Sequence, residues 1–188
     1  MDGRIPRVLV TVASRHGATE EMARALADCL VESAAGRQHG LSAVAVPVER
    51  RPDPARFDAV VLGSGVYAGR WLEPARHYAA EHVAALRGRP VWLLSSGPIG
   101  DPPFPPDEPH DAGPIGASIR ARGHRVFPGR LDKKLLSIGE RALVTAMRAP
   151  VGDSRDWVAL RAWAEEIAEQ VVVGAAGRPP SPAAPLPS

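Results

Sequence analysis

Three near-continuous apolar runs, each too short for an ordinary helix, are the feature that most restricts how this chain can fold. They read VLVTVA from Val8, AVVLGS from Ala59 and VWLLSS from Val91. Strands that are covered on both faces need this composition, which is typical of parallel sheets. Segments with helical periodicity separate the runs, and this alternation predicts a doubly wound α/β fold.

Five strands are expected from this pattern. They cover Arg7–Ala13, Ser42–Val46, Ala59–Ser64, Pro90–Ser95 and Arg125–Pro128. The second run alternates only weakly and is followed at once by Pro47, so we expect it at an edge of the sheet.

Three helices are expected between and after the strands. The first follows Gly17, because Met22, Leu26, Cys29 and Leu30 recur on one helical face. A second is expected from about Leu72 to Leu86. The last is expected after Gly152, with Asp153 or Ser154 as its cap. Its Trp157 and Trp163 are interpreted as core residues. The remaining segments predict a turn over Gly36–Gly40 and a long loop over Gly97–Pro114.

The 188 residues fit one domain, which we place at residues 1–173, with an inserted segment at about 132–150. Residues 174–188 are Gly, Ala and Pro with almost no charge, and we expect them to form a disordered tail. No stretch approaches the apolar length of a membrane span, and the short polar N-terminus does not resemble a signal peptide. The lone Cys29 suits a reducing compartment, and His and Cys are too scattered for a metal site. We therefore expect a cytoplasmic protein without a metal.

Charge excludes one class of partner. The formal net charge is only +2, and basic and acidic residues are interspersed. This excess is too small to indicate nucleic-acid binding.

The motif that carries most chemistry is VASRHGATE, which joins the first apolar run to the first helix. A loop in this place presents unpaired backbone N–H groups and the positive end of the helix dipole, so it can bind an anion. Ser14 and Thr19 add hydroxyl groups, and Gly17 lets the backbone approach the anion closely. The spacing matches neither G-x-G-x-x-G nor G-x-x-x-x-G-K-[ST]. A short hydroxyl-rich loop suits a single terminal phosphate, such as that of FMN. The alternative is an ordinary strand-to-helix turn capped by Thr19.

This motif resembles the phosphate loop of flavodoxins, hydroxyl-x-hydroxyl-Gly-x-Thr, with His16 in place of the second hydroxyl. The resemblance implies a flavodoxin-like doubly wound sheet of five parallel strands in the order 2-1-3-4-5, with helices on both faces. It also implies a non-covalently bound FMN whose phosphate contacts Ser14, Arg15, His16, Gly17, Ala18 and Thr19.

In a sheet of this order, ligands bind at the carboxyl ends of the strands, beside the point where the strand order reverses. The loops after the third and fourth strands should therefore enclose the flavin ring. The first of them comprises Ser64, Gly65, Val66, Tyr67, Ala68 and Gly69. The second contributes Ser96, Gly97, Pro98 and Gly100. Tyr67 and Trp71 offer flat faces for stacking, although both can instead cover the end of the sheet. Arg70 is either a cation near the flavin or a solvated surface residue.

The C-terminal third resembles flavodoxin-domain proteins related to menaquinone-dependent protoporphyrinogen IX dehydrogenase. The resemblance rests on the extra segment after the fifth strand and on the D-x-R-D-W sequence that begins at Asp153. It implies an FMN-dependent oxidoreductase that passes electrons from a reduced organic substrate, porphyrinogen-like or quinol-like, to a quinone or another acceptor. The sequence offers no convincing acid–base pair, so we assign no catalytic residue.

Two other functions stay open at this stage. One is a non-catalytic electron carrier of the flavodoxin type, which the basic character of the chain disfavours because such carriers dock through an acidic rim. The other is a flavin-free scaffold or regulatory protein, for which His16 is the supporting feature.

The inserted segment allows two interpretations. Leu135, Leu136, Leu143, Val144 and Met147 are apolar and are flanked by four basic residues, Lys133, Lys134, Arg141 and Arg148. We expect a helix packed on the domain with solvated charges. The alternative is peripheral contact with the inner face of the cell membrane, since basic amphipathic segments bind anionic lipid.

Overall fold

A computed structural model describes residues 5–97, 109–146 and 151–176 of the chain. Its main sheet has five parallel strands in the order β2-β1-β3-β5-β6. The strands are β1 (Arg7–Ala13), β2 (Ser42–Pro47), β3 (Ala59–Tyr67), β5 (Val91–Ser96) and β6 (Gly123–Phe127). A two-residue strand, β4 (Arg70–Trp71), pairs antiparallel with the end of β3. Counted among the parallel strands alone, this is the predicted order 2-1-3-4-5, with the Pro47-bearing strand at an edge as expected.

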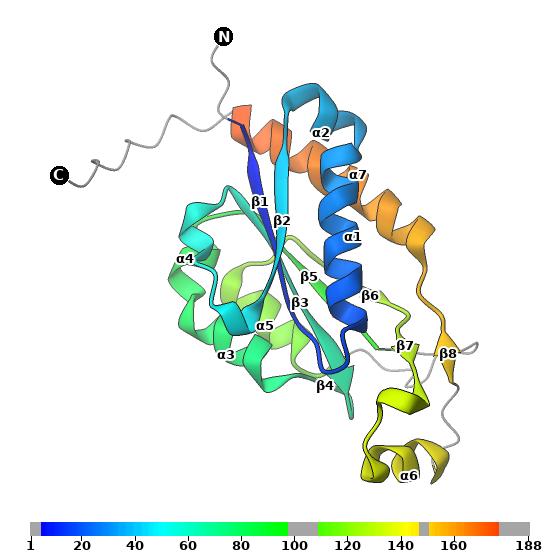
Figure 1. Cartoon of the computed structure of the whole chain (residues 1–188). Helices are drawn as coiled ribbons and strands as arrows, with labels where there is room; N and C mark the ends of the chain where they lie inside the picture. The colour runs from blue at the N-terminus through cyan, green and yellow to red at the C-terminus, as the bar shows by residue number, and fades with distance from the viewer. Residues whose placement is uncertain (1–4, 98–108, 147–150, 177–188) are drawn as a thin grey trace, which may run out of the picture.

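Helices cover both faces of the sheet (Figure 1). On one face lie α1 (Ala18–Glu32), α2 (Ala34–His39) and α7 (Trp157–Ala176), and on the other lie α3 (Glu73–Glu81), α4 (Val83–Arg87) and α5 (Ala112–Ile119). Two short 3-10 helices, Val48–Arg50 and Pro54–Arg56, connect β2 to β3. Each layer buries an apolar face against the sheet, which is the arrangement that parallel sheets require.

The strand sequences explain the two cores. In β1, Val8, Val10 and Val12 pack with α1 and α7, whereas Leu9 and Ala13 pack toward α3 and α5. Successive strand residues point to opposite faces, so an apolar run places side chains in both cores. The predicted stripe on α1 is confirmed, because Met22, Leu26 and Leu30 are buried in the first core.

The helices differ from the sequence prediction in several places. The helix expected over Leu72–Leu86 is interrupted at His82, which separates α3 from α4. The turn expected over Gly36–Gly40 is wrong, because Ser33 caps α2 and accepts a hydrogen bond from the Gly36 amide. α5 begins at Ala112, inside the segment interpreted as loop, and α7 continues to Ala176, past the expected start of the tail. Residues 177–188 lie outside the described residues.

The start of the last helix also differs. Neither Asp153 nor Ser154 caps α7, since the Ala159 amide donates to the Asp156 carboxylate. Trp163 is a core residue as expected, but Trp157 is 42% exposed. Its ring lies beside the Arg155 guanidinium, 4.6 Å from the ring centroid, instead of in the core.

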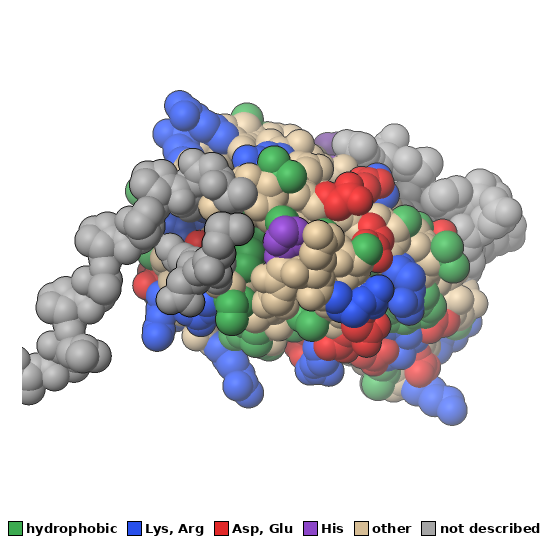
Figure 2. Space-filling view, turned by 90° about the horizontal axis from the view of Figure 1, so that it is seen from above, with side chains coloured by type: hydrophobic (Ala, Val, Ile, Leu, Met, Phe, Trp, Pro, Cys, Tyr) green, Lys and Arg blue, Asp and Glu red, His purple; other side chains and the backbone are tan. Residues whose placement is uncertain are grey.

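The inserted segment lies beyond the carboxyl ends of the strands (Figure 1). It begins with β7 (Arg130–Leu131), followed by a 3-10 helix (Lys133–Leu135) and α6 (Ile138–Ala146). It ends with β8 (Gly152–Asp153), which pairs antiparallel with β7. The opposite end of the molecule, at the amino ends of the strands, carries interspersed basic and acidic side chains (Figure 2).

Candidate functional site

The phosphate loop joins β1 to α1 with a turn that glycine makes possible. Gly17 has φ 82° and ψ −16°, and no atom lies within 4 Å of the place a Cβ would occupy. This left-handed backbone is strained for other residues. The Gly17 amide donates to the Ser14 hydroxyl oxygen at 3.1 Å, so the turn is closed by its own hydrogen bond.

The first turn of α1 presents its amides at the end of the helix. The first hydrogen bond of the helix runs from the Glu21 amide to the Gly17 carbonyl, and no side chain caps this end. The amides of Ala18, Thr19 and Glu20 therefore precede the helical ladder and are available to an anion. Thr19 is buried within the helix and is not the cap, so the turn is not the ordinary capped turn considered as the alternative.

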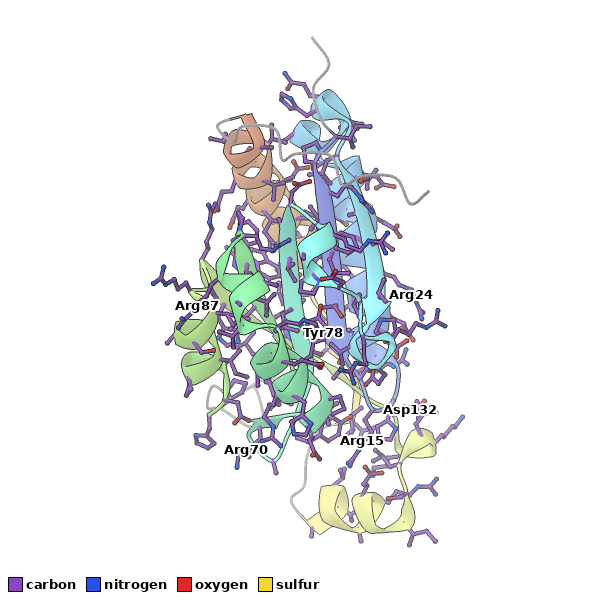
Figure 3. All side chains as sticks on the ribbon, turned by 90° about the vertical axis from the view of Figure 1, so that its left-hand side faces the viewer. Arg15, Arg24, Arg70, Tyr78, Arg87 and Asp132 are labelled. Atoms are coloured by element: carbon purple, nitrogen blue, oxygen red, sulfur yellow. The ribbon has the colours of Figure 1, made fainter. Side chains whose placement is uncertain are left out.

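Arg15 and His16 bring side-chain nitrogen atoms to the same loop. Arg15 lies at the end of the molecule that carries α6 (Figure 3), and its guanidinium is 5.0 Å from the centroid of the Tyr67 ring. His16 meets the edge of the same ring. The His16 Nε2 atom is buried and has no hydrogen-bond partner in the described part of the chain. Because buried polar atoms are normally paired, this nitrogen fits a phosphate oxygen.

The loop after β3 forms a tight hairpin into β4. Ala68 and Gly69 both have positive φ, at 49° and 72°, as two-residue hairpin turns require. Tyr67 is half-buried, and burial raises the pKa of its hydroxyl. The Ser64 hydroxyl is engaged within the fold, since it donates to the Gly65 carbonyl and accepts from the Leu72 amide.

Close packing brings the three predicted loops together. A Cβ on Gly65 would lie 3.2 Å from the Thr19 hydroxyl, and one on Gly97 would lie 2.7 Å from Val66 Cβ. Ser64 to Tyr67, which the sequence assigned to a loop, instead form the end of β3, and only Ala68 and Gly69 make the turn. This end of β3 touches the phosphate loop on one side and the residue after β5 on the other. Ser96 donates to the sulfur of Met22 on α1 at 3.4 Å. The other two predicted contacts, Pro98 and Gly100, lie outside the described residues.

The structure gives Trp71 and Arg70 other roles than contact with a ring. Trp71 is only 2% exposed, and its indole N–H donates to the Ser95 hydroxyl at 2.7 Å. It is therefore a core residue and offers no free face. Arg70 is neither free nor fully solvated, because it forms an ion pair with Asp111 at 3.0 Å and lowers the pKa of that carboxyl.

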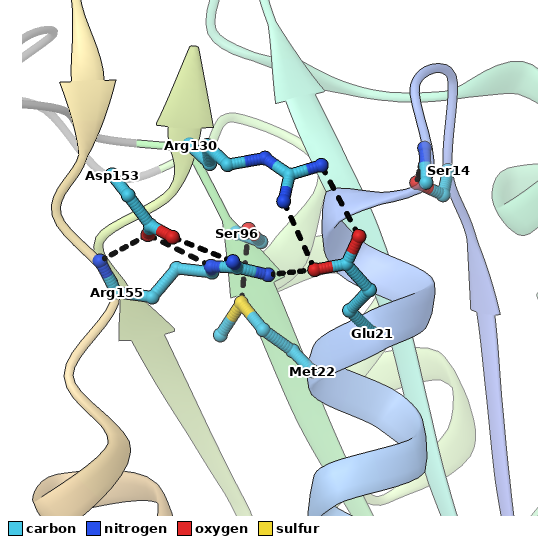
Figure 4. A network of polar contacts seen from close by, with 8 residues as sticks. Ser14, Glu21, Met22, Ser96, Arg130, Asp153 and Arg155 are labelled. Carbon is cyan, nitrogen blue, oxygen red and sulfur yellow. Dashed lines mark hydrogen bonds and ion pairs between the residues drawn. The ribbon is translucent and has the colours of Figure 1, made fainter. Parts of the chain in front are cut away.

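An ion-pair network that the sequence analysis did not predict fixes the inserted segment to α1 (Figure 4). Arg130 donates to both carboxylate oxygens of Glu21 at 3.1 Å. Arg155, whose side chain is 6% exposed, donates to Glu21 at 2.7 Å and to Asp153 at 2.6 and 2.8 Å. The D-x-R-D-W sequence was the available signal: Asp153 holds Arg155, Asp156 caps α7 and Trp157 stacks on Arg155.

Among the described residues, no group of His, Cys, Asp and Glu side chains is arranged to hold a metal ion. In the same residues, none of the helices has the length and apolar character needed to cross a membrane.

Comparison with known proteins identifies the family. A model described as a flavodoxin domain matches residues 9–157. The chain belongs to the flavodoxin domain family. FMN is therefore the cofactor, and the function is a flavin-dependent redox function. The uncapped amides of α1 and the His16 Nε2 atom, which lacks a hydrogen bond, fit its phosphate group.

Solved structures show the same fold at low sequence identity. A flavodoxin from the domain Archaea is 15% identical with a TM-score of 0.57, covering 88% of this chain and 98% of that one. An oxidoreductase from Corynebacterium diphtheriae is 11% identical with a TM-score of 0.58, covering 93% and 99%. Rubredoxin oxygen:oxidoreductase from Desulfovibrio gigas is 13% identical with a TM-score of 0.58, and the match covers 93% of this chain and 38% of that chain. A search of curated protein sequences found no match.

Proposed function

We propose that this protein is an FMN-dependent oxidoreductase that takes electrons from a small reduced organic molecule, porphyrinogen-like or quinol-like. A quinone or another acceptor then receives them. When bound, FMN supplies the electron-transfer chemistry. The protein binds its phosphate through the amides of Ala18 to Glu20, through the hydroxyls of Ser14 and Thr19, and through Arg15 and His16. Gly65 and Gly97 let the neighbouring segments approach closely, and Tyr67 offers its ring for stacking.

The observation that carries this proposal is the position of the inserted segment. Glu140 of α6 reaches Arg15 in the phosphate loop at 2.8 Å, and the Arg130 and Arg155 ion pairs hold the base of the segment on α1. Because the inserted segment lies beside the phosphate loop, it restricts the approach of a large partner. This favours a small substrate over a broad protein surface as the redox partner. Cationic side chains such as Arg15 also differ from the acidic rim through which carrier proteins dock.

The same segment supports a relation to menaquinone-dependent protoporphyrinogen IX dehydrogenase. That resemblance rested on the extra segment and on the D-x-R-D-W sequence, and Asp153 and Arg155 now have a specific task in fixing the segment. This supports a porphyrinogen or a quinol as the class of substrate and a quinone as the class of acceptor.

We further propose that the protein acts in the cytoplasm, at the inner face of the cell membrane when the acceptor is lipid-soluble. Exposed Leu135 and Ile138 lie near Lys133, Lys134 and Arg141 on the inserted segment. Basic residues around apolar ones favour an anionic lipid surface. Co-sedimentation with anionic vesicles, and none with neutral vesicles, is the expected result. Equal recovery with both would contradict the membrane contact.

Turnover measurements test the proposed function. The purified protein is reconstituted with FMN, and the oxidation of a porphyrinogen or a quinol is followed with a quinone as acceptor. We expect many turnovers per flavin. Stoichiometric one-electron exchange with a partner protein, without turnover, would indicate the carrier function instead. A colourless protein that takes up no added FMN would contradict both redox functions and favour a flavin-free scaffold or regulatory protein.

The phosphate loop is tested by the double variant Ser14→Ala, Thr19→Ala. It removes the hydroxyl that closes the turn and the one that lies beside Gly65. Each lost hydrogen bond to a charged group is worth about 1.5–3 kcal/mol, so we expect FMN to bind at least tenfold more weakly. Ser118→Ala, on the distant helix α5, is the control. An unchanged FMN affinity in the double variant would refute the loop assignment.

A further inference from the structure

The Glu140 carboxylate accepts hydrogen bonds from two places at once, its own helix end and the phosphate loop. Within its own helix it completes a capping box with Ser137: the Ser137 amide donates to Glu140 Oε2 at 2.8 Å, and the Glu140 amide donates to the Ser137 hydroxyl at 3.3 Å. These hydrogen bonds lower the pKa of the Glu140 carboxyl, so the group is an anion at neutral pH.

The other carboxylate oxygen faces the phosphate loop. Glu140 Oε1 accepts a hydrogen bond from Arg15 Nη1 at 2.8 Å and lies 3.6 Å from His16 Nε2. The Glu140 side chain is 25% exposed, so water screens this contact only in part. The loop that is built for an anion thus already holds a negative charge supplied by another element, 125 residues away in sequence.

A phosphate group would need the same two nitrogen-bearing side chains. A phosphate monoester carries close to two negative charges at neutral pH, and a carboxylate at hydrogen-bond distance from the same donors repels it. The two anions therefore compete for Arg15 and His16, and the backbone amides of α1 are the donors that only the phosphate uses.

We propose that Glu140 is a specificity-determining residue of the cofactor site, which weakens binding of the phosphate end of the flavin by competing for Arg15 and His16. The inference rests on the proposed function, since it concerns the same loop. It has a consequence for α6: binding of the phosphate withdraws Arg15 from Glu140 and so loosens the contact between α6 and the loop.

The experiment compares Glu140→Gln with the wild type. Glutamine keeps the capping box, because the amide oxygen still accepts from Ser137, but it removes the charge. Binding of FMN and of riboflavin, which lacks the phosphate, is measured by flavin fluorescence on protein freed of flavin. Glu166→Gln is the matched control. It removes the same charge, but Glu166 pairs with Arg125 on the body of the domain.

We expect Glu140→Gln to bind FMN about 2- to 5-fold more tightly, as for one partly screened charge contact. Riboflavin binding should not change, and Glu166→Gln should match the wild type for both flavins. In the background of Arg15→Gln, the gain from Glu140→Gln should shrink, since one of the shared donors is gone. Hydrogen exchange of amides 138–146 in the wild type should also become faster when FMN is added.

Three results would overturn the proposal: FMN binding that is unchanged or weaker in Glu140→Gln, an equal gain for riboflavin, or an equal gain in Glu166→Gln. Any of these, found with a wild type that binds FMN, refutes the role of Glu140 alone and leaves the proposed function in place. A wild type that binds neither flavin refutes the proposed function, and with it the proposed competition between Glu140 and the phosphate.

Discussion

At the scale of single residues, glycines decide how closely the three loops can approach. Gly65 and Gly97 are both placed where a side chain would meet a neighbouring element, and the Gly97 amide also donates to the Phe127 carbonyl at 3.2 Å. Gly17 has a different task, since its backbone conformation and not the lack of space requires glycine there. The site thus depends on residues that have no functional group of their own.

Gly97→Ala is expected to destabilise the protein by about 1–3 kcal/mol, the usual range for forcing a group into a packed region. The added methyl carbon would lie 2.7 Å from Val66 Cβ, so the end of β3 and the loop after β5 must separate. Urea denaturation measures the loss. Gly139→Ala is the control, because a Cβ there meets no atom within 4 Å and alanine favours the helix. Equal stability of the two variants would show that the loops do not need this contact.

At the scale of elements, the hairpin of β7 and β8 is held on α1 by charge. The two strands contribute two residues each, too few to bury an apolar core. Arg130 and Arg155 instead share the Glu21 carboxylate, which comes from the first turn of α1. The base of the inserted segment and the phosphate loop are therefore positioned by the same helix.

Arg155→Met is expected to lower the free energy of unfolding by about 1–3 kcal/mol, because the variant loses hydrogen bonds to two charged groups. Methionine retains part of the apolar contact with Trp157. Arg125→Met provides the comparison, since the Arg125–Glu166 pair is exposed on both sides and should be worth less than about 1 kcal/mol. Similar losses in both variants would contradict a special role for the Arg155 network.

The same network makes stability depend on pH in the acid range. Arg155 lowers the pKa of both Glu21 and Asp153 in the folded protein. Their contribution is therefore fully present above the ordinary carboxyl pKa of about 4, and it is lost as the pH falls through the lowered values. Urea midpoints between pH 6 and pH 3 should converge for wild type and Arg155→Met. A gap that stays constant over this range would contradict the assignment.

At the scale of the whole molecule, the two cores of the domain lie outside the inserted segment. Both core clusters are built from the sheet and its covering helices, and neither contains a described residue between Arg130 and Asp153. Leu131 is the partner of Gly152 across the hairpin, so the two ends of the segment already lie at turn distance. We therefore expect the domain to fold without the segment.

Replacement of residues 132–151 by the two-residue turn Asn-Gly should leave a folded domain, because such a turn joins antiparallel strands directly. The expected loss is the burial of Leu136, about 1.5–3 kcal/mol. Thermal unfolding by circular dichroism should remain a single cooperative transition. A molten or insoluble product would show that the segment belongs to the folding unit.

The sequence predicted the strands of the sheet well because their signals are local. An apolar run of six residues indicates a buried strand wherever it occurs, and the rules of parallel sheets then bring the ends of β1, β3 and β5 to one edge. At that edge the structure pairs Ala13 with Ser64 and Gly65 with Ser96. Helix bounds were less well predicted, as at His82, where α3 ends and α4 begins. The free-energy differences between continuing and ending a helix at one residue are small, so the sequence does not reveal the break.

The residue pattern alone predicted the strands, the two covered faces of the sheet and the glycine-bearing loop at the start of α1, whereas the strand order came from the resemblance to flavodoxins. The tertiary structure decided which side chains surround that loop. Arg155 meets Glu21 across 134 residues and Arg15 meets Glu140 across 125. It also decided that Trp163 is buried while Trp157 is exposed. Periodicity reports the face on which a residue lies, but a pair so distant in sequence leaves no local pattern, and only the folded chain brings its members within hydrogen-bond distance.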